Sequence, residues 1–194
     1  MAREYTVLKR QQYESGAYRV VPIRAQDKYD IMRMRNEQIY HLRQTSPLTK
    51  SNQDLYFKDV ISKLFEAQKP SQILFSYLHG EVLIGYGGLV HINWVDKNSE
   101  ISFIIKTHRD KEFSLHWTHF LNMITEVTFE ELGFHKFFTY AFNLRLHLYA
   151  VLEENGFNEE ARLKEHCFFE DKYIDVVIHS KFNKNLIYRV KAGS

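Results

Sequence analysis

Residues 81–106 read EVLIGYGGLVHINWVDKNSEISFIIK, and this stretch decides the fold. Apolar and β-branched residues dominate both halves, and Asp96-Lys97-Asn98 supplies a turn between them. The stretch therefore predicts two antiparallel strands, over Glu81–Trp94 and Glu100–Lys106. Three glycines in the first strand indicate a bulge or a close backbone approach: Gly85, Gly87 and Gly88.

Upstream of this stretch the chain predicts further elements of one sheet with helices. His79-Gly80 has turn chemistry, so the strand before it pairs with Glu81–Trp94 as a hairpin. The elements expected here are a strand over Tyr18–Arg24, a helix from an N-cap at Asp27 to Asn36, a helix from Ser51 to about Lys69, and a strand over Ile73–Leu78.

Downstream, helix and strand patterns alternate before a final hairpin. Gly133 and Gly156 follow apolar-periodic segments, as glycines do at helix C-termini. The elements expected here are a helix over Phe113–Leu132, a strand over Lys136–Phe142, a helix over Leu144–Asn155, and strands over Ala161–Phe169 and Tyr173–Phe182. This order predicts a mixed α/β (α+β) domain with a mainly antiparallel central sheet flanked by helices, and a late β-α-β unit.

Length and composition favour a single domain. The chain has 194 residues, of which 44% are hydrophobic, and a net charge of +2. We expect an irregular arm over residues 1–16, a domain over 17–183 and a tail over 184–194. The scattered basic residues give no reason to expect a nucleic-acid partner, and no segment has the length and hydropathy of a membrane span. The polar N-terminal residues lack a signal-peptide core, so we expect a cytoplasmic protein.

The histidines and the cysteine do not form a metal-binding pattern. The single cysteine, Cys167, excludes an intramolecular disulfide and a cysteine-rich site. His116 and His119 share a helix face, but no HExxH motif is present. We therefore expect no metal, and we interpret Cys167 as a small packing residue rather than a catalytic thiol.

Several segments, in order over residues 18–182, resemble those of the GNAT superfamily of N-acyltransferases. Residues 83–89 (LIGYGGL) are similar to its third strand, and 99–105 (SEISFII) to its fourth. Residues 129–136 (FEELGFHK) resemble the end of its third helix, and 151–157 (VLEENGF) a later helix end. The branch that it resembles holds ribosomal-protein alanine acetyltransferases and nucleotide-amino-sugar acetyltransferases, and Arg35-Asn36 resembles the "RN" of that branch. The resemblance implies a GNAT-like fold and acetyl-CoA as the cosubstrate.

The chemistry requires a base for the attacking amine and a proton donor for the departing thiolate. The resemblance implies Glu100 as the first candidate base, because it begins the strand that splays to admit the pantetheine arm of the cosubstrate. His91 is the second candidate, since histidine titrates near neutral pH. Tyr149 lies three residues before the position, Leu152, at which the family often has a tyrosine, so it is the candidate acid. A solvent-facing glutamate and a packing tyrosine are the alternative interpretations.

The cosubstrate site is also implied by the resemblance. The backbone of Phe103, Ile104 and Ile105 is expected to pair with pantetheine. The family places a glycine-containing loop before the next helix, where amides bind the diphosphate. Here residues 109–114 read RDKEFS, with Glu112 and Ser114 at the glycine positions. The candidates for the cofactor-binding residues of this region are Arg109, Lys111, Ser114 and, beyond the next strand, Asn143.

The acceptor groove is expected around the first helix. Its candidate residues are Arg35, Asn36, Tyr40 and Arg43, with Tyr86 and Trp94 as an aromatic wall. Basic groups there suit an anionic acceptor, so the leading hypothesis is a small amine, namely a nucleotide-linked amino sugar. Acetylation of a protein N-terminus or lysine, and a binding module that has lost catalysis, are the alternatives. A homodimer is a further expectation, which exposed aromatic residues suggest.

Overall fold

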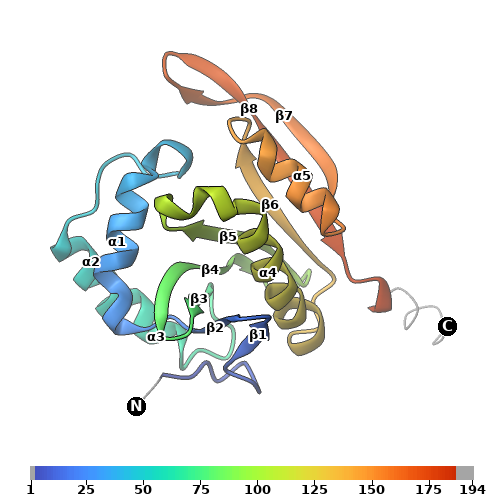
Figure 1. Ribbon diagram of the computed structural model, residues 1–194. Coiled ribbons are helices and arrows are strands. Elements are labelled where there is room, and N and C mark those ends of the chain that lie inside the picture. Colours follow the sequence, from blue (N-terminus) through green and yellow to red (C-terminus); the bar gives the residue numbers. More distant parts are fainter. Residues whose placement is uncertain (1–2, 187–194) are drawn as a thin grey trace.

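The computed structural model describes residues 3–186 and shows one mixed sheet with helices on both sides (Figure 1). The strands lie in the order β1-β2-β3-β4-β5-β6-β8-β7, and every neighbouring pair is antiparallel except β5 and β6. Their bounds are β1 Tyr13–Ser15, β2 Tyr18–Pro22, β3 Ile73–His79, β4 Val82–Asn93, β5 Asn98–Ile105, β6 Lys136–Phe142, β7 Asn158–Phe169 and β8 Lys172–Phe182. The predicted α+β class is confirmed.

Five α-helices of the described residues accompany the sheet: α1 Lys28–Glu37, α2 Lys50–Tyr56, α3 Ser62–Leu64, α4 Phe113–Thr125 and α5 Leu146–Glu154. A π-helical turn over Phe57–Ile61 joins α2 to α3, and another over Glu126–Glu131 extends α4. Short 3-10 turns precede α1 (Ala25–Asp27), follow it (Ile39–His41) and precede α4 (Thr107–Glu112).

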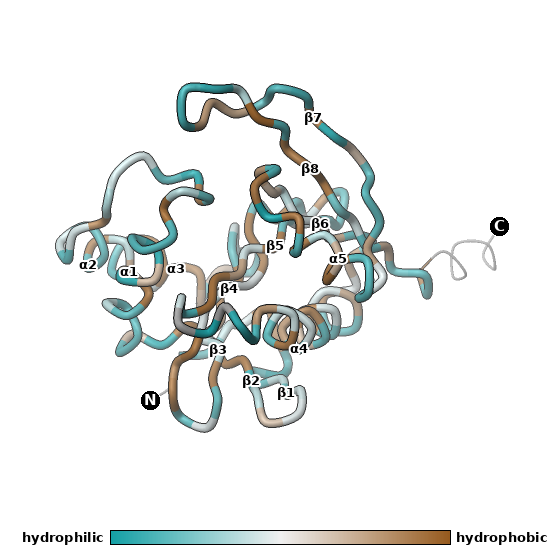
Figure 2. Tube along the Cα trace, turned by 45° about the horizontal axis from the view of Figure 1, so that its top comes forward, coloured by the Kyte–Doolittle hydropathy of each residue, from teal (hydrophilic) through white to brown (hydrophobic). Residues whose placement is uncertain are grey.

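Two successive residues of β4 show that α1 and α4 cover opposite faces of the sheet. The Tyr86 hydroxyl accepts a hydrogen bond from Arg35 of α1. A Cβ added at Gly87 would instead lie 3.0 Å from the Phe120 ring of α4. Side chains alternate between the faces along a strand, so these contacts define the two layers. Figures 1 and 2 show the same division, and in Figure 2 the most hydrophobic residues run along the central strands.

The sheet opens between β5 and β6. These strands pair in parallel only from Asn98 to Glu100, although β5 continues to Ile105 and β6 to Phe142. Helix α4 makes the crossover between them, as a β-α-β unit requires. The remainder of β6 pairs with β8 on its other side. The chain therefore leaves a wedge between β5 and β6 that no strand fills.

Part of the predicted irregular arm is ordered and packed. Tyr13–Ser15 form β1 against β2, and the Tyr5 and Tyr13 side chains are buried in the core. The Tyr5 hydroxyl donates to the carbonyl oxygen of Leu74 in β3 and accepts from its N–H, both at 2.9 Å. Sequence periodicity does not detect this, because the segment contributes single side chains rather than a repeating face. Residues 187–194 of the predicted tail lie outside the described residues.

The predicted N-cap position of α1 is confirmed, whereas the predicted start of α2 was wrong. Asp27 precedes α1, but its side chain makes no capping bond; it accepts hydrogen bonds from Arg24 and from the Ser76 hydroxyl. Helix α2 is capped by Thr49 rather than Ser51, in a reciprocal capping box with Asn52.

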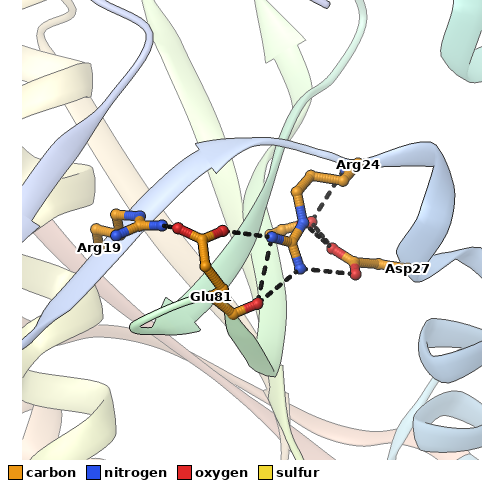
Figure 3. Close-up of polar contacts among 5 residues, drawn as sticks. Arg19, Arg24, Asp27 and Glu81 are labelled. Carbon is orange, nitrogen blue, oxygen red and sulfur yellow. Dashed lines mark hydrogen bonds and ion pairs between the residues drawn. The ribbon is translucent and has the colours of Figure 1, made fainter. Parts of the chain in front are cut away.

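A polar network ties the start of α1 to the β3–β4 turn (Figure 3). Glu81 lies between the guanidinium groups of Arg19 and Arg24, and Arg24 also pairs with the buried Asp27. Because Asp27 is 4% exposed, its carboxylate needs these partners to offset desolvation. The network fixes the position of α1 beside β4.

Candidate active site

A cavity of about 450 Å³ lies between the α1–α2 segment and the wedge between β5 and β6. We call it the wedge cavity. Its wall is largely apolar, with contributions from Ile31, Phe57 and Leu148, and its polar side chains converge from α1, β4, β5 and β6. The charged groups that line it are Arg35, Arg43, Arg145 and Glu100. A concave, mostly apolar site with few converging polar groups is typical of a small-molecule binding site.

The open edge of β5 forms one side of this cavity. The Lys106 N–H donates to the Ile84 carbonyl oxygen at 2.9 Å, so Ile105 and Gly85 form a non-hydrogen-bonded pair. The peptide groups of Ile105 and, by alternation, Phe103 therefore point away from β4, into the wedge. Gln38 already donates to the Ile105 carbonyl oxygen at 2.7 Å. The edge can pair with an extended amide-containing chain such as pantetheine.

This geometry divides the three predicted pantetheine residues. Phe103 and Ile105 present backbone groups to the wedge, whereas the backbone of Ile104 points toward Tyr86 in β4. The sequence cannot make this distinction, because it depends on the register between β4 and β5.

Glu100 lies in the wall of the wedge cavity, at the last position of β5 that pairs with β6. Its side chain is 9% exposed and forms an ion pair with Arg43, which reaches it from the segment after α1. His91 Nε2 lies 3.9 Å from the other carboxylate oxygen. His91 has a φ of 49° at an irregularity in the β4–β5 pairing, and such bulges often redirect a side chain. The structure therefore brings both predicted bases into one cavity.

Tyr140 of β6 is the residue that sequence reasoning missed. It lines the wedge cavity, its hydroxyl lies 3.7 Å from Cys167 Sγ, and the Arg43 guanidinium lies 4.5 Å from its ring centroid. Burial, with a smaller contribution from Cys167, raises the pKa of Tyr140 to about 12. A phenol with this pKa stays protonated at neutral pH and can donate a proton. Its position on the diverging part of β6 is the signal that could have indicated it.

Tyr149 and Asn143 line neither the wedge cavity nor a second cavity at the N-terminus of α4. The Tyr149 hydroxyl donates to Asn143 Oδ1 at 3.2 Å, and its ring stacks on His179 of β8. From α5 the wedge cavity receives Leu148 instead. Tyr149, three residues before Leu152, was predicted to reach the thioester from the same side of α5. That prediction of its direction is wrong, because the Tyr149 side chain turns toward β8.

A second cavity of about 640 Å³ lies at the N-terminus of α4, and we call it the α4 cavity. Lys111, Ser114 and Tyr40 line it, so these three predicted residues are brought together. Arg109 does not line it, although Glu112, to which its guanidinium donates at 2.9 Å, does. His116 lies 3.3 Å from the same Glu112 oxygen. The hydrogen bond from Arg109 and, to a smaller extent, the contact with His116 lower the pKa of Glu112.

The predicted acceptor residues separate into two groups. Arg35 and Tyr86 line the wedge cavity and are hydrogen-bonded to each other at 2.8 Å. Asn36 instead holds the segment after α1, since its amide exchanges hydrogen bonds with both backbone groups of Leu48. Trp94 lies away from both cavities, where its indole donates to the Pro70 carbonyl oxygen and its ring contacts Phe134.

Two observations concern what the described residues do not form. Among the side chains that the structure describes, which leave out those of residues 108 and 110, no group of three or more His, Cys, Asp or Glu residues could hold a metal ion. Over residues 3–186, no helix is long and apolar enough to cross a membrane.

Solved structures of other proteins share the fold of this chain. The spermidine N-acetyltransferase from Vibrio cholerae in complex with CoA and spermine aligns with a TM-score of 0.77 and 19% identity, over 89% of this chain and 99% of that one. Mutant forms of the spermidine/spermine N-acetyltransferase SpeG from the same organism align at 0.73 and 20%, over 91% and 99%. A dodecameric form of the Vibrio enzyme aligns at 0.72 and 20%, over 90% and 99%.

Comparison at the level of sequence gives the family. No curated protein matches the chain significantly in sequence. The family model described as an acetyltransferase (GNAT) domain matches residues 20–178, which is most of the chain. The chain therefore belongs to the GNAT acetyltransferase family, as an acetyl-CoA-dependent N-acetyltransferase that acts on an amine.

Proposed function

We propose that the protein acetylates a small primary amine that also carries a carboxylate or phosphate group. The observation that carries this proposal is the charge of the wedge cavity. Three arginines line it, and Glu100 is the one carboxylate among its described lining residues. The described contacts of Arg35 are with neutral groups, Tyr86 and Gln44, so its charge is available to an anionic ligand.

The charge also argues against a polycation as the acceptor. The similar Vibrio cholerae enzyme was solved with spermine, but spermine would place several positive charges beside Arg35, whose described hydrogen bonds go to neutral groups. Like charges in a confined site disfavour binding and so act as a selective element. A nucleotide-linked amino sugar stays within the proposed class, with the amino sugar inside the cavity of about 450 Å³ and the nucleotide toward its mouth.

The reaction follows from the groups around the wedge. Acetyl-CoA supplies a thioester, which the open edge of β5 holds through its pantetheine arm. Glu100 accepts a proton from the acceptor amine, directly or through water, and the amine nitrogen forms a bond to the acetyl carbonyl carbon. The carbon–sulfur bond then breaks, the Tyr140 hydroxyl donates its proton to the departing sulfur, and a proton from solvent restores the phenol. His91, whose side chain is 65% exposed, can return the proton from Glu100 to solvent.

Release of free CoA thiol with three matched sets of acceptors tests the proposal. The sets are primary amines with and without a carboxylate or phosphate, spermidine with spermine, and peptides with a free N-terminus or lysine. We expect the anionic amines to give the highest kcat/KM. Higher values for the polyamines or the peptides would overturn the proposed acceptor class. Binding of CoA without turnover of any set would favour the non-catalytic alternative.

A further inference from the structure

We propose that Arg43 determines acceptor specificity through an exchange of ion pairs with Glu100. The carboxylate or phosphate of the acceptor takes the place of Glu100 beside Arg43, and its ammonium group takes the place of Arg43 beside Glu100. The inference rests on the proposed function and deepens it, because it restricts the acceptor to amines whose anionic group lies a few bonds from the nitrogen. The observation behind it is the ion pair itself, which holds the candidate base in the wall of the wedge cavity.

The Glu100 carboxylate needs a positive partner. Its side chain is 9% exposed, and it is the one carboxylate among the described residues that line the cavity. Arg43 donates a hydrogen bond to one of its oxygens, and His91 Nε2 lies 3.9 Å from the other. A carboxylate that has lost most of its hydration is stable only beside a compensating charge. The ammonium group of an acceptor can supply that charge, but it must first displace Arg43.

The Arg43 side chain can leave Glu100 while its backbone stays in place. Its side chain is 47% exposed, and its described contacts are with Glu100 and the Tyr140 ring. Arg43 lies in a turn after α1, where the next residue, Gln44, accepts a hydrogen bond from Arg35 at 3.0 Å. A half-exposed ion pair contributes little net free energy, so a second anion can compete for the guanidinium.

The exchange favours an acceptor that carries both charges. Such an amine replaces one ion pair by two, because its ammonium pairs with Glu100 and its anion with Arg43. A carboxylate or phosphate has more than one oxygen, so it can also accept from Arg35, which lines the same cavity. An amine without an anion would place its ammonium beside an uncompensated Arg43, and like charges disfavour that arrangement. Since Arg43 and Glu100 are in contact before the exchange, the two charges of the acceptor must also lie close together.

Steady-state kinetics with matched acceptors test the inference. The acceptors are ω-amino acids and ω-aminoalkyl phosphates of increasing chain length, each compared with the carboxamide or alcohol that lacks the anion. The proteins are wild type, Arg43→Gln, Arg35→Gln, and Arg43→Lys, which keeps the charge but not the planar guanidinium. Arg33→Gln is the control, because Arg33 is exposed on α1 and pairs with Asp30.

We expect the wild type to prefer the anionic amines, and most strongly those with the shortest chains. Arg43→Gln should lower kcat/KM for them about tenfold or more, as the loss of a charge-assisted hydrogen bond does. The same variant should raise kcat/KM about two- to fivefold for amines without an anion, because their ammonium no longer competes with Arg43 for Glu100. Arg43→Lys should keep part of the preference, and Arg33→Gln all of it.

The rise with amines that lack an anion separates Arg43 from Arg35. Arg35→Gln should weaken the anionic amines without this rise, because Arg35 has no described contact with Glu100. An Arg43→Gln enzyme that keeps the wild-type preference, or loses activity equally with both kinds of amine, would overturn the inference and leave the acceptor class intact. A wild type without any preference for anionic amines would instead overturn the proposed function.

Discussion

Arg43 and Glu100 form an ion pair in the wall of the wedge cavity, although 57 residues separate them in the chain. The contact joins the segment after α1 to the position at which β5 stops pairing with β6. Arg43 also lies over the Tyr140 ring, so one guanidinium connects the candidate base with the candidate acid. The acceptor side and the thioester side of the site are therefore linked through a single residue.

Replacement of Tyr140 by Phe should remove the proton donor while it keeps the ring that Arg43 contacts. We expect kcat to fall about 10- to 100-fold, within or just below the usual range for a general acid. With an acetyl thioester of a more acidic thiol the loss should be smaller, because that thiolate departs without a proton. Tyr149→Phe is the matched control and should retain the wild-type kcat. Equal losses with both thioesters would contradict a role in leaving-group protonation.

Arg35→Gln should reduce selectivity for anionic amines. Loss of a charge-assisted hydrogen bond of about 1.5–3 kcal/mol raises KM for such an acceptor about tenfold or more. The KM for acetyl-CoA should change less, because the described hydrogen bonds of Arg35 go to Gln44 and Tyr86 and not to the open edge of β5. The control is Arg33→Gln, two residues away on α1, where Arg33 is exposed and pairs with Asp30. Steady-state kinetics with each substrate varied would measure both KM values. If the assignment is wrong, the KM for the amine and the KM for acetyl-CoA will change in parallel.

Gly88→Ala should destabilise the sheet much more than Gly80→Ala. Both glycines have a positive φ, 150° and 57°. A Cβ at Gly88 would lie 2.0 Å from the Ile73 carbonyl oxygen. A Cβ at Gly80 would have no described heavy atom within 4 Å, apart from those of its two chain neighbours. We expect about 1 kcal/mol for Gly80→Ala and 3 kcal/mol or more for Gly88→Ala, roughly the sum of backbone strain and overpacking. Urea denaturation measures both; similar values would refute the close approach.

His41 should make stability depend on pH. Its pKa is lowered to about 4 in the folded protein from an ordinary value of 6.5. Between these values the unfolded chain binds a proton that the folded chain does not, so stability falls as pH decreases from 6.5 toward 4. The slope from this residue is at most about 1.4 kcal/mol per pH unit. Desolvation lowers the pKa of His116, His119 and His179 too, which adds slope of the same sign.

Replacement of His41 by Gln removes this contribution. Free energies of unfolding, measured by urea denaturation at pH 7, 6 and 5, should therefore decline less in the variant than in the wild type. A variant with the full wild-type slope would show that His41 titrates normally in the folded protein.

The strands were predicted closely because each carries its own local signal. Lys136–Phe142 has its predicted bounds, and the His79-Gly80 turn forms a hairpin as expected. The helix extensions through π-helical turns and the packed arm were not predicted, because they depend on contacts with distant parts of the chain. The cytoplasmic location and the homodimer stay predictions.

For the site, the sequence predicted residues whose roles follow from their position in a strand. It missed residues whose roles depend on the direction in which a strand or helix turns their side chains. Glu100 and Phe103 were predicted from the resemblance of the strand that carries them, and both line the wedge cavity. Tyr140 was missed and Tyr149 chosen, because the divergence of β6 from β5 and the rotation of α5 are tertiary features. Arg145 was not predicted as a site residue, and only the structure shows that it lines both cavities.

The most direct test of the account is the rate of acetyl transfer by Glu100→Gln. The variant keeps the size of the side chain and removes the base, so kcat at saturating acetyl-CoA and amine should fall about 10²- to 10⁴-fold. Glu14→Gln on β1, where Glu14 is exposed and contacts Gln12, should retain the wild-type rate. CoA affinity, measured by calorimetry, should be similar in all three proteins. A Glu100→Gln enzyme that keeps more than about half of the wild-type kcat would contradict the account.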